Sequence, residues 1–303
     1  MISPTHFFSP GKLLLTAEYF VLDGALALAV PTKLGQDMQV EKYLDAAGIL
    51  SWQAYHQGKL WLNITLNLRD WQIINTNERN AAHFVQQLLE GIENRVPGIF
   101  EKGFSYKFTT NLQFPADYGL GSSSTLINNL AEWSGADAFE LNHHFLKGSG
   151  YDIAVAQQKA PLLYRNKPEI LVKKVDYTPA FKNEIIFIHL NKKQNSRHGI
   201  QLYHSKKKSD DLVEEFSALT EEFFAAKNVE SLEAIIREHE EKLSHFLEIP
   251  TVQSQFFKDY NGAIKSLGAW GGDFILATKS DGWKDYFRSK NFPGIFEWDE
   301  LIG

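Results

Sequence analysis

The segment of residues 115–124 constrains the fold of this 303-residue chain more than any other. It reads Pro-Ala-Asp-Tyr-Gly-Leu-Gly-Ser-Ser-Ser, and it lies between a predicted strand, Phe104–Leu112, and a helical pattern at residues 126–131. Because glycine lacks a Cβ, this backbone can turn tightly and approach a ligand closely. Three serines open the helix, whose first N–H groups and positive dipole end suit an anion such as phosphate. By itself, the pattern is equally consistent with an ordinary serine-capped helix after a glycine turn.

Composition excludes several classes of protein. The chain has no cysteine, which excludes disulfide frameworks, thiolate zinc sites, iron–sulfur clusters and a cysteine nucleophile. Its formal charge of −6 argues against a nucleic-acid partner, which usually requires a basic face. No apolar run approaches the ~18–20 residues of a membrane-spanning helix, and the first basic residue, Lys12, comes too late for an ordinary signal peptide. We therefore expect a cytoplasmic protein with no nucleic-acid and no membrane partner.

The order of the predicted elements indicates two α+β halves. Strands dominate the beginning of the chain, with an apolar run closed by Pro31 and then two further segments, at residues 25–30, 35–43 and 49–66. Helical spacing appears in the stretches 81–92, 126–131, 212–223, 232–246 and 252–267, and a strand follows at 274–278. Pro179 lies in the best candidate for a domain junction. This order predicts a two-domain α+β protein with domains at residues 1–178 and 179–303.

Three further segments contain residues that can do chemistry. Residues 9–31 read S-P-G-K-L-L-L-T-A-E-Y-F-V-L-D-G-A-L-A-L-A-V-P, and residues 268–273 read G-A-W-G-G-D. Residues 148–156 read G-S-G-Y-D-I-A-V-A, in which a lone carboxylate, Asp152, stands between a glycine loop and a helix start of small residues. Taken singly, Asp152 is better explained as a helix N-cap, and Lys12 as a solvated strand lysine.

Taken together, these four segments resemble the motifs of the GHMP kinases, which comprise galactokinase, homoserine kinase, mevalonate kinase and phosphomevalonate kinase. Residues 9–31 are similar to the opening motif in its mevalonate and phosphomevalonate kinase form. Residues 115–124 match the phosphate loop P-x-x-x-G-L-G-S-S-[AS] at every fixed position. Residues 148–152 match the G-S-G-x-D element, and residues 268–273 are similar to G-A-G-G-G-[DG]. The segments follow one another in the family's order.

The resemblance implies a fold and an activity. The N-terminal domain is expected to be ribosomal-S5-like and the C-terminal domain ferredoxin-like. The implied activity is an ATP- and Mg²⁺-dependent phosphorylation of a small-molecule acceptor, with mevalonate or phosphomevalonate of isoprenoid precursor synthesis as the expected acceptor. The protein is expected to be a monomer or a homodimer. A catalytically impaired sensor or interaction protein with the same fold stays open as an alternative, and so does a relative of diphosphomevalonate decarboxylase.

The resemblance also implies roles for individual residues. Asp152 corresponds to the aspartate that accepts the proton of the substrate hydroxyl, and Lys12 to the lysine that pairs with this aspartate. The implied ATP contacts are Pro115, Gly119, Leu120, Gly121, Ser122, Ser123, Ser124, Gly271 and Gly272. The implied substrate contacts are Glu18, Tyr19 and Gly150. The implied Mg²⁺ ligands are Ser122, Ser123 and Glu140.

Several positions depart from the family's pattern. Ala17 stands where glycine is usual, and Tyr19 replaces the histidine of mevalonate kinases. The metal-binding glutamate expected eleven residues before Asp152 is Leu141, so that Glu140, one residue away, is the candidate instead. Trp270 interrupts the glycine run of the last motif. This large ring is expected to narrow the pocket, to stack on a ligand or to accompany a loss of activity.

Overall fold

The computed structural model describes residues 4–191, 196–268 and 270–303. The chain forms two compact units, and each is assembled from separate stretches of sequence. Unit 1 comprises residues 1–11, 34–116 and 121–157, and unit 2 comprises residues 12–33, 117–120 and 158–303. The division into domains 1–178 and 179–303 stays a prediction.

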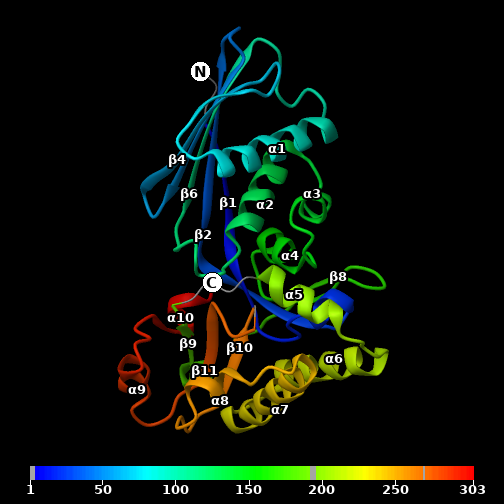
Figure 1. The fold of residues 1–303 in the computed structure, drawn as a ribbon, viewed down its shortest axis with the longest axis vertical. Coiled ribbons are helices and arrows are strands. Elements are labelled where there is room, and N and C mark those ends of the chain that lie inside the picture. Colours follow the sequence, from blue (N-terminus) through cyan, green and yellow to red (C-terminus); the bar gives the residue numbers. More distant parts are fainter. Residues whose placement is uncertain (1–3, 192–195, 269) are drawn as a thin grey trace. The chain divides into compact units, whose positions relative to one another are not determined.

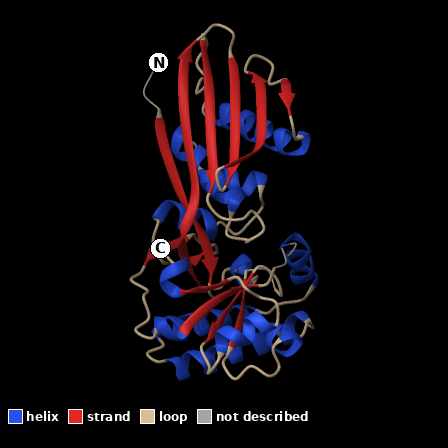
Figure 2. Cartoon of the chain, turned by 90° about the vertical axis from the view of Figure 1, so that its left-hand side faces the viewer, coloured by secondary structure: helices blue, strands red, loops and turns tan. Residues whose placement is uncertain are grey.

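Unit 1 is a mixed sheet with helices on one face (Figures 1 and 2). Its strands follow the order β5–β4–β3–β6–β2, with bounds Ile73–Thr76, Lys59–Asn67, Ile49–His56, Phe104–Leu112 and Ala27–Leu44. These pairs are antiparallel except β3 and β6, which are parallel because a long crossover through β4, β5 and α1 joins them. The helices are α1 (Arg79–Arg95), α2 (Ser122–Ser134), α3 (Ala138–Phe145) and α4 (Tyr151–Gln158).

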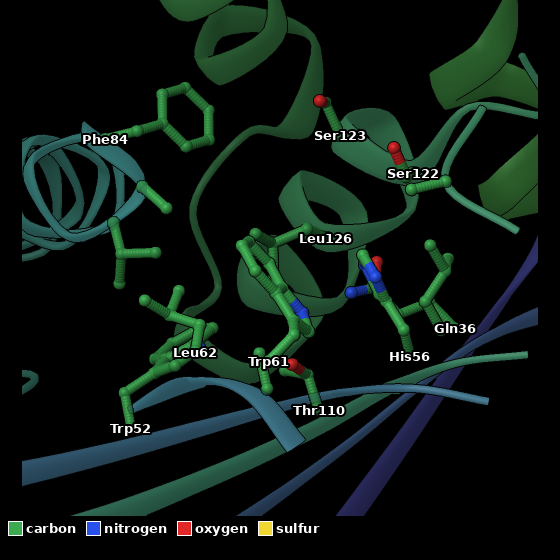
Figure 3. A pocket seen from close by; sticks show the side chains of 15 residues that line it. Gln36, Trp52, His56, Trp61, Leu62, Phe84, Thr110, Ser122, Ser123 and Leu126 are labelled. Carbon is green, nitrogen blue, oxygen red and sulfur yellow. The ribbon is translucent and has the colours of Figure 1, made fainter. Parts of the chain in front are cut away.

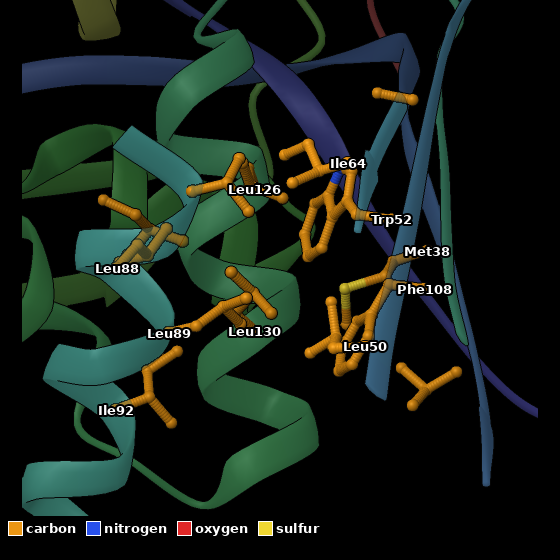
Figure 4. Packing of buried hydrophobic residues seen from close by; sticks show 14 of the residues in the cluster. Met38, Leu50, Trp52, Ile64, Leu88, Leu89, Ile92, Phe108, Leu126 and Leu130 are labelled. Atoms are coloured by element: carbon orange, nitrogen blue, oxygen red, sulfur yellow. The ribbon is translucent and has the colours of Figure 1, made fainter. Parts of the chain in front are cut away.

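A hydrophobic core between the sheet and the helices holds α2 in place (Figure 4). Alternate residues of the central strands point into this core, as the period of two in a β-strand requires. The rings of Trp52 and Phe108 stack there with centroids 5.3 Å apart. The helices contribute the fully or almost fully buried side chains Leu88, Leu89, Ile92, Leu126, Ile127 and Leu130. Packing of α2 against the sheet fixes where its first turn lies within unit 1.

Unit 2 contains a four-stranded antiparallel sheet with the order β10–β11–β9–β12. The bounds of these strands are Ile264–Leu267, Phe274–Thr278, Ile185–His189 and Ile295–Glu297. Strand β1 (Thr5–Leu14) pairs with β2, and both strands are divided between the units, since residues 5–11 of β1 belong to unit 1 and residues 12–14 to unit 2. The remaining elements of unit 2 are β7 (Leu162–Arg165), β8 (Leu171–Lys174), and the short helices η1 (Phe20–Asp23) and η2 (Lys182–Glu184). Its α-helices are α5 (Ser196–Ser205), α6 (Asp210–Ala225), α7 (Val229–Leu247), α8 (Val252–Phe256), α9 (Trp283–Ser289) and α10 (Trp298–Leu301).

The predicted strand Phe104–Leu112 is confirmed, and the helical spacing at residues 81–92 lies within α1. Pro31, however, does not close a strand, because β2 runs through it from Ala27 to Leu44. In unit 2, β2 pairs with β7 through residues 27–29, and in unit 1 it pairs with β6 through residues 36–44. Pro31 falls between these two ladders, so its missing N–H group removes no hydrogen bond from the pairing with β7 or with β6.

The prediction of a helix over residues 252–267 is wrong for the second half of that range. Helix α8 ends at Phe256, and Ile264–Leu267 form β10, whose residues pair with β11. The intervening turn brings Gly262 against Thr278, where a Cβ would lie 2.4 Å from the Thr278 carbonyl oxygen. The four residues Ile264–Leu267, with two apolar ends around a lysine and a serine, are too few to separate strand from helix by periodicity, so pairing within the sheet decides the outcome.

Among the residues that the structure describes, no helix combines the length and the apolar character that crossing a membrane requires.

We expect Leu130→Ala to lower the free energy of unfolding by about 2–5 kcal/mol, because it leaves a cavity between α2 and the sheet. Leu130 is 0 % exposed, whereas Leu44 is 85 % exposed at the end of β2. The matched control Leu44→Ala should therefore change stability by no more than about 0.5 kcal/mol. Urea unfolding of both variants measures the difference, and equal losses would contradict the burial described here.

Candidate active site

The first turn of α2 in unit 1 is open to an anion. Gly121 is the N-cap residue with φ 88°, and no side chain caps the helix. Its carbonyl accepts hydrogen bonds from the Thr125 N–H at 2.9 Å and from the Ser124 hydroxyl at 2.9 Å. Ser124 is therefore turned inward, whereas Ser122 is half-buried and Ser123 is exposed. A helix whose first N–H groups have no side-chain cap is a favourable place for phosphate oxygens.

A cavity of about 320 Å³ lies beside this turn, entirely within unit 1 (Figure 3). Its lining is mainly apolar, and Ser122 and Ser123 contribute hydroxyl groups to it. The rings of His56 and Trp61 stack with centroids 4.7 Å apart. The lining residues are Gln36, Trp52, Ala54, His56, Trp61, Leu62, Ala81, Phe84, Val85, Thr110, Leu112, Ala116, Ser122, Ser123 and Leu126. This size and lining are typical of a pocket for a small molecule with an aromatic or apolar part.

In unit 2, Lys12 holds the beginning of the glycine loop. The Lys12 N–H donates to the Leu120 carbonyl at 3.0 Å, and its Nζ donates to the Gly119 carbonyl at 3.0 Å. Gly119 has φ 67°, and a Cβ there would lie 2.2 Å from Asp273 Oδ2. Residue 119 therefore has to be glycine for two reasons: its φ is positive, and the Asp273 carboxylate occupies the space that a Cβ would need. Leu120 is buried, and Pro115 is half-buried in unit 1.

Asp152 lies in unit 1 as the second residue of α4 rather than as an N-cap. Its side chain is half-buried, and Oδ1 accepts a hydrogen bond from the Ile153 N–H at 3.2 Å. Gly150, with φ 94°, precedes the helix, and its carbonyl accepts from the Ala154 N–H at 3.0 Å. Lys12 belongs to unit 2, so the expected pairing of Lys12 with Asp152 stays a prediction.

The residues around the predicted metal site supply few ligands. Glu140 is exposed on α3, with Oε2 4.0 Å from Arg95 Nε, and Leu141 is fully buried in the core. The described part of the chain has no cluster of three histidine or acidic side chains that could hold a metal ion. Magnesium commonly binds through one or two protein groups together with substrate phosphates. The hydroxyls of Ser122 and Ser123 fit that kind of site, whereas an all-protein magnesium cage does not fit the residues present.

Glu18 lies in a buried cluster of charged groups in unit 2. Its Oε1 is 2.5 Å from Lys265 Nζ, and its Oε2 is 3.3 Å from His239 Nε2. Glu240 Oε1 is 3.9 Å from the same ammonium. Burial raises the pKa of Glu18, and it raises the pKa of Glu240 to about 8. Burial also lowers the pKa of His239 well below its usual value. The structure thus gives Glu18 an ion pair, and its contact with a substrate stays a prediction.

Tyr19 connects the opening motif to the last motif within unit 2. Its hydroxyl accepts a hydrogen bond from the Trp270 N–H at 2.9 Å, and its ring stacks on Tyr203 of α5 with centroids 5.7 Å apart. Gly271 and Gly272 follow Trp270 in a turn, whereas Ala269 lies outside the described residues. Tyr19 is 7 % exposed and Trp270 is 4 % exposed. These two rings therefore fill space inside unit 2 in the structure as it stands.

The sequence analysis did not predict Lys265, Tyr203 or the residues that line the cavity, apart from Ser122 and Ser123. Lys265 had no clear signal, since it lies in the mixed segment Ile-Lys-Ser-Leu of residues 264–267, which gives no sign that the lysine is buried. The other cavity residues had none, because they come from separate parts of the chain, mainly from β2, β3, β4, α1, β6 and α2.

An uncapped helix start beside an apolar cavity, in an α+β chain, is an arrangement suited to nucleotide binding. No family model matches this sequence, and no curated protein matches it either. The fold does match solved structures over nearly the whole chain, and it is the GHMP kinase fold.

Mevalonate kinase of Methanococcus jannaschii has a TM-score of 0.69 at 16% identity, over 97% of this chain and 98% of that one. Phosphomevalonate kinase of Streptococcus pneumoniae, in complex with phosphomevalonate and AMPPNP, has a TM-score of 0.66 at 17% identity, over 97% and 98% of the two chains. Galactokinase of Lactococcus lactis, complexed with galactose, has a TM-score of 0.65 at 14% identity, over 95% and 89%.

Glu240 makes folding dependent on pH. Because burial raises its pKa from 4.5 to about 8, the folded chain holds more protons than the unfolded chain between these values. Stability should then fall as pH rises, by up to about 1.4 kcal/mol per pH unit. Glu240→Gln should remove this fall.

Urea unfolding of the wild type and the variant at pH 5.5 and 7.5 measures this difference. Because both proteins contain Glu18, His239 and Lys265, the difference between their pH profiles reports on Glu240. Glu241→Gln, at the exposed neighbouring residue, is the matched control and should keep the wild-type slope. Parallel pH profiles for the wild type and Glu240→Gln would refute the prediction.

Proposed function

We propose that this protein is an ATP- and Mg²⁺-dependent kinase of a small metabolite. The observation that carries the proposal is the uncapped first turn of α2 beside the cavity in unit 1. The cavity is large enough for part of a nucleoside, and the open N–H groups are suited to the phosphates that such a nucleoside carries. The resemblance of residues 115–124 to the family's phosphate loop supports the same assignment.

The proposed mechanism uses few groups, since phosphoryl transfer mainly requires positioning and charge neutralisation. The N–H groups and hydroxyls of Ser122 and Ser123 bind phosphate oxygens. Mg²⁺, when bound with ATP, supplies charge neutralisation on those oxygens, and the same two hydroxyls would hold it. Where the acceptor group is a hydroxyl, as in mevalonate, Asp152 accepts its proton as that oxygen attacks the γ-phosphorus and ADP leaves. Where the acceptor group is a phosphate, as in phosphomevalonate, the attacking oxygen already carries negative charge and no such proton has to be removed. The Lys12 ammonium stabilises negative charge on the oxygens of the reaction.

The proposed acceptor is mevalonate or phosphomevalonate. Residues 9–31 are most similar to the opening motif of the kinases that act on these two compounds, and several of the solved structures with this fold carry those names. Tyr19 replaces the histidine of the mevalonate kinase motif, which favours the phosphomevalonate kinase pattern. ADP release with mevalonate, phosphomevalonate, homoserine and sugars as acceptors would decide among them.

A non-catalytic sensor with the same fold is the second candidate. Two observations favour it: Trp270 is buried where the family has glycine, and Leu141 lies in the core where a metal-binding glutamate is expected. A sensor would bind nucleotide or metabolite and release no ADP with any acceptor. Release of CO₂ in the same assay would instead identify a decarboxylating relative.

We expect Ala81→Leu to weaken the binding of an ATP analogue at least about tenfold. Ala81 lies on α1 and lines the cavity, so added methyl groups occupy space that the nucleoside needs. Ala218→Leu on an exposed position of α6 is the matched control and should bind normally. Isothermal titration measures both affinities. Inorganic tripolyphosphate should bind the two variants equally, and an unchanged affinity of Ala81→Leu for the analogue would show that the base lies elsewhere.

We expect Asp152→Asn to lower turnover by about 10²–10⁴ while the affinity for ATP is unchanged, because it removes only the proton acceptor. Asparagine can still accept the hydrogen bond from the Ile153 N–H, so the helix start is retained. Asp137→Asn, at the N-cap of α3, is the matched control and should keep full turnover. Steady-state ADP release measures both rates, and full activity of Asp152→Asn would exclude the assigned role.

A further inference from the structure

Tyr118 is the one large ring in the Pro-Ala-Asp-Tyr-Gly-Leu-Gly loop, and it lies against three rings of the unit 2 sheet. Its centroid is 4.3 Å from that of His189 at the end of β9, with the two planes tilted by 33°. Phe274 of β11 meets it edge-on at 5.4 Å, and Phe296 of β12 meets it edge-on at 6.2 Å. Three neighbouring strands of one sheet thus supply the surface on which this loop residue rests.

The surface under Tyr118 is itself well packed. His189 and Phe274 are directly opposite each other in the β9–β11 ladder, and Phe274 is fully buried. Phe274 also contacts Phe296, with centroids 5.9 Å apart. The His189 ring is 4 % exposed, and its Nε2 has no hydrogen-bond partner among the described residues. His189 therefore contacts Tyr118 through the face of its ring rather than through a hydrogen bond.

The residues after Tyr118 need such support. Gly119 and Gly121 both have positive φ, and glycine loses more backbone freedom than any other residue when a structure is fixed. Lys12 bonds to the carbonyls of Gly119 and Leu120, and the Asp273 carboxylate fills the space beside Gly119. These contacts act on residues 119 and 120 only. Tyr118 restrains the chain just before them.

We propose that Tyr118 is a positioning residue that holds the loop in its ligand-binding conformation before the ligand arrives. Its ring, seated on His189, Phe274 and Phe296, restricts the backbone of residues 117–120. A loop ordered in advance loses less entropy on binding, so affinity for the ligand rises without any new contact. The part of this inference that concerns nucleotide phosphates rests on the proposed function. The anchoring of the loop in the free protein does not rest on it.

Hydrogen exchange of the full-length, ligand-free chain tests the anchoring. Tyr118→Ala should raise exchange in peptides spanning residues 116–121 by about tenfold, whereas Tyr118→Phe should keep the wild-type rate because the ring remains. His189→Phe should also keep the wild-type rate. Phe292→Ala removes another half-buried ring of unit 2, one that contacts Phe257, and it should leave exchange of the loop unchanged. Equal exchange in Tyr118→Ala and the wild type, or an equal rise in Phe292→Ala, would overturn the proposal.

Titration of the same proteins with an ATP analogue tests the consequence for binding. Tyr118→Ala should bind about tenfold more weakly than the wild type, and Tyr118→Phe should restore the affinity. Thermal unfolding shows whether the weaker binding of Tyr118→Ala comes only from a general loss of stability. Phe292→Ala is the comparison, because it should lower Tm and leave the affinity for the analogue unchanged. If the wild-type protein bound no nucleotide, the proposed function would be refuted. The hydrogen-exchange rates would still show whether Tyr118 anchors the loop. Weak binding by Tyr118→Phe as well would show that the hydroxyl, not the ring, matters.

Discussion

The candidate site depends on a helix that begins without a side-chain cap. Gly121 occupies the N-cap position of α2 with a positive φ, which glycine adopts at little cost. An ordinary N-cap side chain would satisfy one of the first N–H groups of the helix, and an anion would then have to compete with it. Because Gly121 has no such side chain, the same residue that turns the chain leaves a helix start that is suited to an anion.

The position of this helix start is set by hydrophobic packing. Leu126, Ile127 and Leu130 anchor α2 to the sheet of unit 1, and Leu126 also lines the cavity. Burial of such side chains is the main favourable term in folding, so the orientation of α2 is maintained by the most strongly stabilised part of the unit. The polar groups at its N-terminus are then held on a rigid element, as precise binding of a ligand requires.

A buried cluster of charged side chains links separate elements inside unit 2. The contact of Glu18 with Lys265 joins the opening motif to β10, and His239 and Glu240 of α7 complete the cluster. A buried ion pair recovers its desolvation cost only with good geometry, and breaking one partner leaves an uncompensated charge. The short distance between Glu18 and Lys265 satisfies this condition. The same fold occurs in kinases at 13–17% identity, so function has to be argued from residues at the site and not from the fold.

The sequence alone determined the features that consecutive residues can encode. The glycine–serine turn, the strand before it, the helix after it and the helix start next to Asp152 follow from local propensity and spacing. Tertiary structure decided the rest. Pairing with β11 made a strand of Ile264–Leu267, and the gap between two ladders allowed Pro31 within β2. The cavity, the partner of Glu18 and the rings beneath Tyr118 involve residues far apart along the chain, because packing in three dimensions brings together side chains that no local pattern relates.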